Sequence, residues 1–227
     1  MPRHTSAAET APAVRIVIVT MDNHLASATD RARATLAAQV PGLSLCMHTA
    51  AEWDSDPAAL ERCRADIARG DIIVSTMLFM DDHIQAVLPA LQARRAHCDA
   101  MVCCMSGAEV TKLTRMGRFD MDARPSGALA FLKRLRPKPK AGADSGSGAR
   151  QMRMLRRLPK ILRFIPGTAQ DVRAYFLTLQ YWLCGSEENV VNMVRMLVDR
   201  YADGARRGLR GTLAHQLPVE YPEVGVY

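Results

Sequence analysis

The sequence lacks several patterns that would define a function at once. No CxxC pair occurs among its 6 cysteines, no GxGxxG follows the first apolar run, and no Walker loop occurs in the 227 residues. These absences argue against a spaced zinc or redox site and against a nucleotide cofactor. No apolar run approaches the roughly 20 residues that span a bilayer, and the first residues lack the apolar centre of a secretory signal. We therefore expect a cytoplasmic protein without a membrane span.

Aromatic residues are scarce, at 5% of the chain, although the net charge is +7. The segment from Lys133 to Arg163 holds eleven cations and the single acid Asp144 and so carries +10, which leaves the remainder with 7 − 10 = −3. A nucleic-acid-binding module would need aromatics among these charges or a recognisable motif. Because neither is present, we expect no nucleic-acid partner.

The cysteines and histidines show no metal-ligand spacing. Cys103 and Cys104 are adjacent on an expected strand, so their side chains should point to opposite faces and pack as buried free thiols. The acidic pairs in the chain each fall at the start of an expected helix, where the helix dipole accounts for them. We therefore assign no metal site. The residues weighed for one are His48, His83, His97, Asp81, Asp82, Glu187 and Glu188.

Four short apolar runs alternate with helical patterns in the first half of the chain. Strands that are apolar throughout and alternate with helices indicate a parallel sheet covered on both faces. The sequence thus predicts an α/β fold, a four-stranded parallel Rossmann- or flavodoxin-like sheet of order 2-1-3-4, followed by a mostly helical carboxyl-terminal part. The expected strands are Val14–Met21, Leu43–Ala50, Ile72–Phe79 and Ala100–Ser106, and the expected helices are Leu25–Gln39, Pro57–Arg69 and Asp81–Arg95.

The carboxyl ends of parallel strands are where such sheets bind ligands. Here the residues at those ends are 22–24, 49–53, 80–82 and 106–109. Two of these positions are acidic, which is unlike a phosphate site. This edge is therefore the expected functional edge, without a nucleotide.

Composition divides the chain further. We expect residues 1–13 to be disordered, 14–132 to form the α/β domain, and 133–150 to be a mobile basic loop, because proline, glycine and like charges oppose packing. Residues 151–203 should be helical, with helices Gln151–Phe164, Ala169–Cys184 and Glu187–Tyr201. Residues 204–227 would begin a linker or next domain, since "LPVEYPEVGVY" resumes a strand-like alternation and then stops, as in a truncated chain.

Several segments, taken in order, resemble one known family. They are "VTMDNHLASA", "DIIVSTMLFMDDHI", "MSGAEVTKLTRMGRFDM", "GTAQDVRAYFLTLQYWLCGSEENVVNMVRMLVDRYA" and "PVEYPEVGVY". This series resembles the amino-terminal region of the large porphyrin-binding (H) subunit of magnesium chelatase, in its bacteriochlorophyll branch. The resemblance covers nearly the whole chain from Val14 onward.

The resemblance implies ATP-dependent insertion of Mg²⁺ into protoporphyrin IX, the step that commits the tetrapyrrole to chlorophyll or bacteriochlorophyll. It implies two partners, the AAA+-type I and D subunits, and protoporphyrin IX as substrate. The family's large subunit is several times longer than this chain, so no catalytic residue is expected here and the fragment alone should be inactive. It should bind no cofactor itself, whereas the full complex uses Mg²⁺, ATP and protoporphyrin IX.

The candidate contact residues for porphyrin or a partner are Lys112, Arg115, Arg118, Glu109 and His24. The three cations are spaced by three, which would align them on one face of a helix after the fourth strand. Such a face suits solvent or an acidic partner, including porphyrin propionates. His24 follows Asp-Asn at a strand-to-helix junction, so capping or hydrogen bonding explains it better than ligation of a metalloporphyrin.

Two other interpretations stay open at this point. The chain could be a non-catalytic docking module for the ATPase subunits or a regulator, or it could belong to the large subunit of a cobaltochelatase that acts on a corrin precursor. The segment "MSGAEVTKLTRMGRFDM" argues against the cobalt branch, because we associate it with the magnesium branch.

Overall fold

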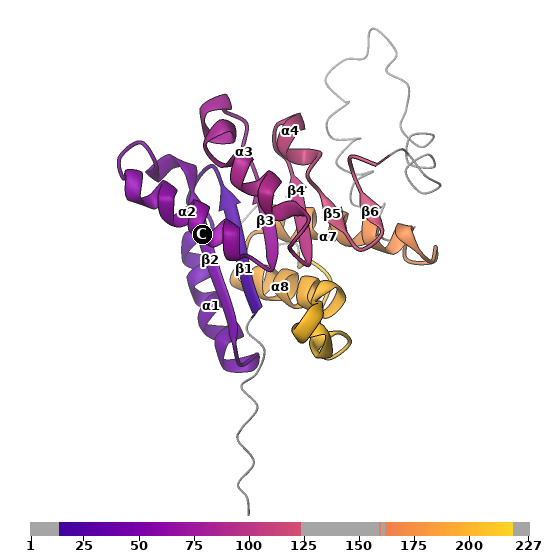
Figure 1. Cartoon of the computed structure of the whole chain (residues 1–227). Helices are drawn as coiled ribbons and strands as arrows, with labels where there is room; N and C mark the ends of the chain where they lie inside the picture. The colour runs from indigo at the N-terminus through magenta and orange to yellow at the C-terminus, as the bar shows by residue number, and fades with distance from the viewer. Residues whose placement is uncertain (1–13, 124–158, 160–161, 220–227) are drawn as a thin grey trace, which may run out of the picture.

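The protein forms a three-layer α/β/α domain in a computed structural model that describes residues 14–123, 159 and 162–219 (Figure 1). A central sheet separates helices α1, α7 and α8 from helices α2 and α3. The expected disordered start, the expected mobile loop 133–150 and most of the expected helix Gln151–Phe164 lie outside the described residues.

The first four strands are parallel, as the sequence predicts. They are β1 (Val14–Thr20), β2 (Leu43–Thr49), β3 (Ile72–Thr76) and β4 (Ala100–Cys104), in the order β2-β1-β3-β4. The register places Val14 beside Leu43, Ile16 beside Ile72, and Ile72 beside Ala100. Each strand ends one to three residues before the end of the apolar run that predicted it. The last residues of these runs therefore lie in the loops at the carboxyl ends of the strands.

Two short antiparallel strands extend the sheet beyond the predicted four. These are β5 (Arg115–Met116) and β6 (Phe119–Asp120), with Met116 paired to Ala100 and Phe119. Where this pairing stops, the buried hydroxyl of Thr114 accepts from the Cys103 amide at 3.0 Å and donates to the Cys103 carbonyl at 2.9 Å. Thr114 therefore replaces a neighbouring strand for the edge of β4.

The described helices are α1 (Ala26–Gln39), α2 (Pro57–Arg69), α3 (Asp81–Arg95), α4 (Ala108–Thr111), α7 (Thr168–Cys184) and α8 (Glu187–Tyr201), with 3₁₀ turns η1 (Ala50–Glu52) and η2 (Gly204–Leu209). All of these helices except the short α4 begin and end close to their predicted limits. The Asp56 carboxylate caps α2 by accepting from the Ala58 amide at 2.9 Å, and Pro57 occupies the first turn. These caps explain why composition located the boundaries well.

Each face of the sheet has its own apolar core. Alternate strand residues face the two cores: Ile16 and Ile18 pack on the side of α1, α7 and α8, while Val17, Ile73 and Cys103 pack on the side of α2 and α3. Cys103 is thus one of four buried thiols, as predicted, whereas Cys46 and Cys184 are half-buried. Each fully buried large apolar side chain contributes about 1.5–3 kcal/mol to stability.

The hairpin of α7 and α8 turns at Gly185. This glycine has φ 34°, and an added Cβ would lie 2.8 Å from a methyl group of Leu25, so the turn needs a residue without a side chain. Ser186 caps α8 by accepting from the Asn189 amide at 3.2 Å. The Ser186 cap therefore fixes the start of α8, and the close contact of Gly185 with Leu25 places the turn against the start of α1.

The chain after η2 lies along α8 through two buried asparagines. Asn189 exchanges two hydrogen bonds with the backbone of Val219, at 3.0 and 2.9 Å. Asn192 accepts from the Gln216 amide at 3.0 Å, and the Tyr181 hydroxyl donates to the Gln216 carbonyl. The described part of the tail, up to residue 219, forms no strand.

Candidate functional site at the carboxyl edge of the sheet

The carboxyl ends of β1 to β4 lie together toward the top of Figure 1. The residues that follow these strands, which the sequence predicts at one edge of the sheet, therefore lie there. Two residues there, Met77 with φ 60° and Met105 with φ 48°, are the non-glycine residues with positive φ in the described part of the chain. Each directly follows its strand, and β3 and β4 are neighbours. Such a conformation costs about 1–3 kcal/mol and concentrates at functional sites.

The loops after β3 and β4 hold each other in place. The Gly107 amide donates to the Leu78 carbonyl at 2.8 Å, and the Leu78 amide donates to the Ser106 hydroxyl at 3.1 Å. An added Cβ on Gly107 would lie 2.6 Å from Ile84 of α3, which makes this position tight. The strained backbone at Met77 and Met105 is therefore held by contacts between the two loops.

His24 joins this edge from the end of β1. Its ring contacts Trp182 edge to face, with centroids 5.5 Å apart, and Trp182 Nε1 donates to the Met77 sulfur at 3.4 Å. The Asp22 carboxylate pairs with His24 Nδ1 and accepts from the His24 amide at 3.2 Å. These bonds lower the pKa of Asp22 below its ordinary value. His24 thus makes a hydrogen bond, as expected at this junction, while its contact with porphyrin or a partner stays a prediction.

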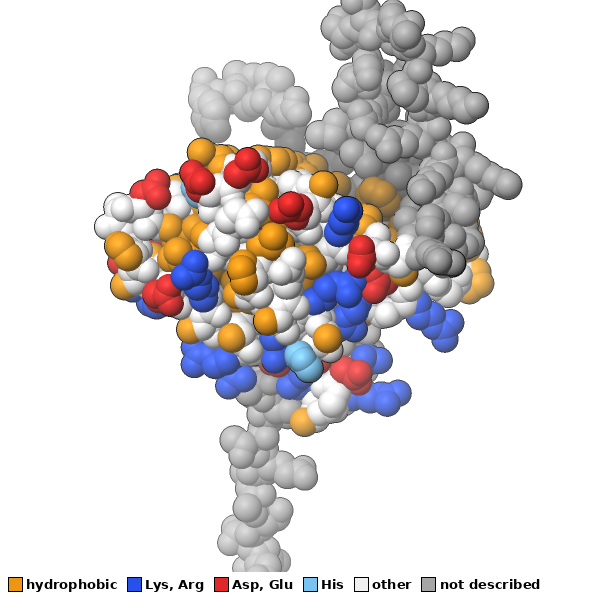
Figure 2. Space-filling model, turned by 45° about the horizontal axis from the view of Figure 1, so that its top comes forward, with side chains coloured by type: hydrophobic (Ala, Val, Ile, Leu, Met, Phe, Trp, Pro, Cys, Tyr) orange, Lys and Arg blue, Asp and Glu red, His pale blue; other side chains and the backbone are white. Residues whose placement is uncertain are grey.

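Exposed apolar side chains stand beside acids at this edge. Phe79 and Met80 are each 54% exposed and directly precede the exposed Asp81 and Asp82 at the start of α3. Figure 2 shows acidic and hydrophobic side chains near the top of the view, with most Lys and Arg side chains lower. The edge thus offers an apolar, acid-bordered contact surface rather than a binding site for anions.

Three buried hydroxyls near this edge have no hydrogen-bond partner. They belong to Thr20 and Thr49, which pair in register at the ends of β1 and β2, and to Ser75 of β3. Buried polar groups are normally paired, so unpaired ones cluster where a site meets water or a ligand. This arrangement marks the same edge as the strained backbone does.

The predicted cationic face does not exist. Helix α4 ends at Thr111, so Lys112 only caps it, Arg115 lies in β5, and Arg118 lies in the turn before β6. Arg115 donates to the carbonyls of Arg95 and Cys98, at the amino edge of the sheet, and cannot face a ligand at the carboxyl edge. The three-residue spacing was misleading because the chain turns back into a hairpin.

The other two candidates, Glu109 and His24, both lie at the carboxyl edge. Glu109 is exposed on α4, with an oxygen 3.4 Å from the amide nitrogen of Gln85, and His24 lies beside Trp182. The structure therefore brings His24 and Glu109 to one edge and sends Arg115 to the other. Sequence reasoning did not find Met77 and Met105, because methionine gives no signal of a left-handed backbone.

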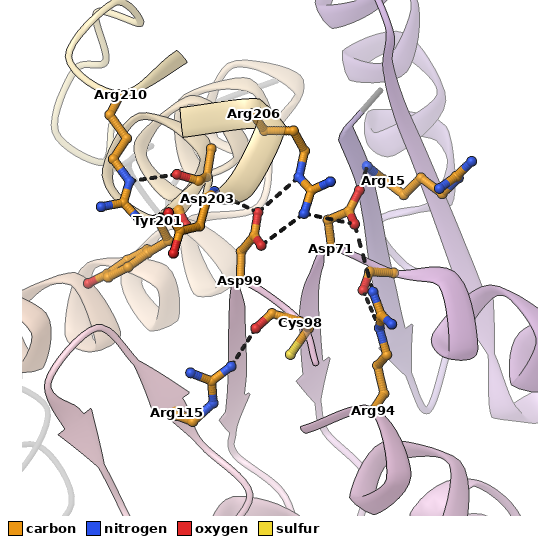
Figure 3. Close-up of polar contacts among 12 residues, drawn as sticks. Arg15, Asp71, Arg94, Cys98, Asp99, Arg115, Tyr201, Asp203, Arg206 and Arg210 are labelled. Atoms are coloured by element: carbon orange, nitrogen blue, oxygen red, sulfur yellow. Dashed lines mark hydrogen bonds and ion pairs between the residues drawn. The ribbon is translucent and has the colours of Figure 1, made fainter. Parts of the chain in front are cut away.

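The amino edge of the sheet has a different chemistry (Figure 3). Arg206 of η2 donates from Nε and Nη2 to Asp99 at 3.0 and 2.9 Å, and its Nη2 lies 3.3 Å from Asp71. Asp71 also accepts from the Arg15 amide at 2.9 Å. This buried network fastens the carboxyl-terminal segment to the starts of β1, β3 and β4.

The turn between β5 and β6 is also held at the amino edge of the sheet. Gly117 has φ 55°, and its Cβ would lie 2.8 Å from the Asp171 carboxylate of α7. That carboxylate accepts from the Arg118 amide at 2.9 Å and from the Tyr201 hydroxyl at 3.0 Å. The segment "TRMGRFD" thus has a structural role, in place of the cationic face predicted for it.

A shallow groove of about 530 Å³ lies between α1 and α8. Three of its four charged side chains pair: Arg31 with Glu187 at 3.1 Å, and Arg195 with Gln39. Thr35 donates to the same Glu187 at 3.0 Å. Most of the charge in the groove is therefore already paired.

The fold is a doubly wound α/β domain, and its candidate contact surface lies at the carboxyl ends of the strands. A family model described as "Domain of unknown function (DUF3479)" matches residues 15–176. The chain belongs to this family.

Relatives at higher identity sharpen this assignment. The chain is 48% identical over 216 residues to the H subunit of magnesium chelatase from Cereibacter sphaeroides and 47% identical over 212 residues to that from Rhodobacter capsulatus. These matches cover 95% and 93% of this chain and 18% and 17% of the relatives. The chain thus spans less than a fifth of their length and resembles their amino-terminal region.

A chloroplast relative is more distant. The ChlH subunit of magnesium chelatase from rice, Oryza sativa subsp. indica, is 28% identical over 165 residues, which cover 72% of this chain and 11% of the relative. No helix among the described residues is both long enough and apolar enough to cross a membrane.

Proposed function

We propose that this chain is the amino-terminal part of the porphyrin-binding H subunit of a magnesium chelatase. The complex would insert Mg²⁺ into protoporphyrin IX, driven by ATP hydrolysis in AAA+-type I and D subunits, in the cytoplasm and on the way to (bacterio)chlorophyll. The proposal rests on 48% identity extending over 95% of the chain. The fragment binds no cofactor of its own, and Mg²⁺, ATP and porphyrin belong to the whole complex.

The geometry supports a contact role for this part of the complex. A porphyrin of about 40 heavy atoms needs a concave apolar site that buries most of its surface. The carboxyl edge offers Phe79 and Met80 on an exposed loop, bordered by the acids Asp81 and Asp82. Those acids would repel propionates, so the edge fits an apolar ring face or the neighbouring part of the same large chain.

The first experiment tests the isolated chain. Deuteroporphyrin is titrated while the fluorescence of Trp182, which lies at the carboxyl edge beside His24, and of Trp53 is recorded at low and high salt. We expect weak quenching and no Mg²⁺ insertion even with I and D subunits and ATP. Tight binding that survives high salt would contradict a mere contact role and would place a complete pocket in this domain.

The second experiment tests the function within a full-length large chain. This chain replaces the matching region of the Cereibacter sphaeroides relative, and Mg²⁺ insertion is measured with the I and D subunits and ATP. We expect the chimera to be active, and the double variant Phe79→Ser, Met80→Ser to be about tenfold slower, as expected when a central apolar contact of about 1.4 kcal/mol is removed. The control Phe164→Ser changes a phenylalanine that is 82% exposed elsewhere and should leave the rate unchanged.

The same chimera separates the contact role from a docking role. The exposed Phe79 and Met80 beside acids also fit a docking surface for one of the ATPase subunits. If the double variant keeps its porphyrin affinity but loses binding of the I or D subunits, the docking role holds. A folded chimera without any insertion activity would contradict the proposed function itself.

A further inference from the structure

Three potential metal ligands converge between β2 and α2. Cys46 and His48 are two residues apart on β2 and so point to the same face, and Asp66 comes from α2. One ligand atom from each lies within 4.8 Å of the others. His48 Nε2 and Asp66 Oδ2 are already 2.9 Å apart. The side chains of His48 and Asp66 are 14% and 31% exposed, so the cluster is shielded yet reachable from solvent.

The chemistry of this donor set selects one class of metal. A thiolate, an imidazole and a carboxylate suit Zn²⁺, whereas Mg²⁺ prefers oxygen ligands and retains its waters. In a tetrahedral zinc site, neighbouring ligand atoms lie about 3.5 Å apart. The three atoms here lie within 4.8 Å of one another, so they would have to approach by at most about 1.3 Å to reach this spacing.

The surroundings orient the ligands, and the Cys46 thiol donates to the Ile16 carbonyl at 3.5 Å, a bond that a metal would replace. Arg69 binds the other oxygen of Asp66, Oδ1, at 2.9 Å, which leaves Oδ2 directed at His48. Such outer contacts fix ligand orientation in metal sites. Arg33 of α1 donates to the Leu45 carbonyl at 2.7 Å and not to the carboxylate.

We propose that Cys46, His48 and Asp66 form a Zn²⁺ site that fastens the edge strand β2 to α2. The fourth position is open to a water molecule, since Cys63, one helical turn before Asp66, is fully buried in the core. This site is independent of the proposed chelatase function and selects a metal other than the one that the complex would insert. Its role is to add a metal link where the hydrogen bond between His48 and Asp66 already joins the two elements.

The test measures metal binding by the 227-residue chain. Calorimetry with Zn²⁺ should give one site, and Co²⁺ should give a thiolate-to-metal charge-transfer absorption. Cys46→Ser should abolish that absorption, and His48→Gln and Asp66→Asn should each weaken Zn²⁺ binding about tenfold or more. The controls Cys184→Ser and His97→Gln, a half-buried thiol and an exposed imidazole outside the cluster, should bind like the unaltered chain.

Two outcomes would overturn the proposal. One is an unaltered chain that binds no Zn²⁺ at millimolar concentration or shows no thiolate absorption with Co²⁺. The other is a set of His48→Gln and Asp66→Asn variants, folded by circular dichroism, that bind Zn²⁺ as tightly as the unaltered chain. The proposal stays testable if Cys46→Ser does not fold, because both of these replacements lie at partly exposed positions.

Discussion

The two edges of the same sheet differ in how their polar groups are satisfied. At the amino edge, the buried Asp71 and Asp99 share Arg206, and a glycine turn is fastened to Asp171. At the carboxyl edge, the backbone is strained at Met77 and Met105 and three buried hydroxyls lack partners. The polar groups of the amino edge are therefore paired, whereas the carboxyl edge is strained, so substitutions should act differently on each.

The largest effect should come from opening the amino edge with Arg206→Ala. This change leaves Asp71 and Asp99, whose side chains are 5% and 8% exposed, without their shared cation. Removing one partner of a buried ion pair costs about 3 kcal/mol of unfolding free energy. Urea unfolding measures this loss. Arg207→Ala, at the exposed neighbouring position, should change the free energy by less than about 0.5 kcal/mol, and equal losses in both variants would remove the contrast between the edges.

A second test at the amino edge is Gly117→Ala. The added Cβ would meet the Asp171 carboxylate at 2.8 Å in a backbone with φ 55°. We expect about 2 kcal/mol of destabilisation from strain and displaced hydrogen bonds. Gly208→Ala, where a Cβ meets nothing within 4 Å, is the matched control for thermal unfolding. An unchanged melting temperature in Gly117→Ala would contradict the fastened turn.

At the carboxyl edge, a substitution that removes backbone strain should not lower the free energy of unfolding as the changes at the amino edge do. Met105→Gly relieves a backbone with φ 48°, which offsets the backbone entropy and the partial burial that the change loses. We expect the unfolding free energy to stay the same or to rise by up to about 1 kcal/mol. Ala108→Gly, in the first turn of α4, should instead lower it by about 0.5–1 kcal/mol. A loss for Met105→Gly as large as that of Ala108→Gly would show that Met105 is unstrained.

The smallest effect concerns the Asp22–His24 pair, which is exposed. Because the folded-state pKa of Asp22 is lowered, its contribution to stability is present above the unfolded pKa and is lost as pH falls through the folded value. Solvent screens the pair, so this contribution is at most about 0.5 kcal/mol. In His24→Ala, the Asp22 carboxyl followed by NMR should titrate closer to its ordinary pKa, whereas His97→Ala should leave it unchanged.

Much of the fold follows from the sequence because each strand is an apolar run between caps. The order β2-β1-β3-β4 and the limits of α2, α3 and α8 were predicted. Strands β5 and β6 were not predicted, since two-residue strands have no periodicity. The glycine of "RMGRF" was the available sign of a turn, and it would have prevented the wrong assignment of Arg115 and Arg118 to a helical face.

The sequence predicted which residues lie at the carboxyl edge, but it did not predict the strained backbone there. The residues after each strand, including Asp22 to His24 and Ser106 to Glu109, do lie at the carboxyl edge. The strain at Met77 and Met105 arises from loop packing, which no residue type signals. The cluster of Cys46, His48 and Asp66 was missed because ligand spacing was sought along the chain, whereas the ligands meet across a strand and a helix.

The two asparagines of α8 affect how this domain can diverge in evolution. Asn189 and Asn192 hold Gln216 and Val219 through backbone atoms of the tail, so the side chains at these two positions do not determine its path. Substitutions at Gln216 and Val219 should therefore be nearly neutral, while either asparagine should tolerate little change. Selection on the path of residues 216 to 219 should thus act on the asparagines of α8 and not on the side chains of the tail.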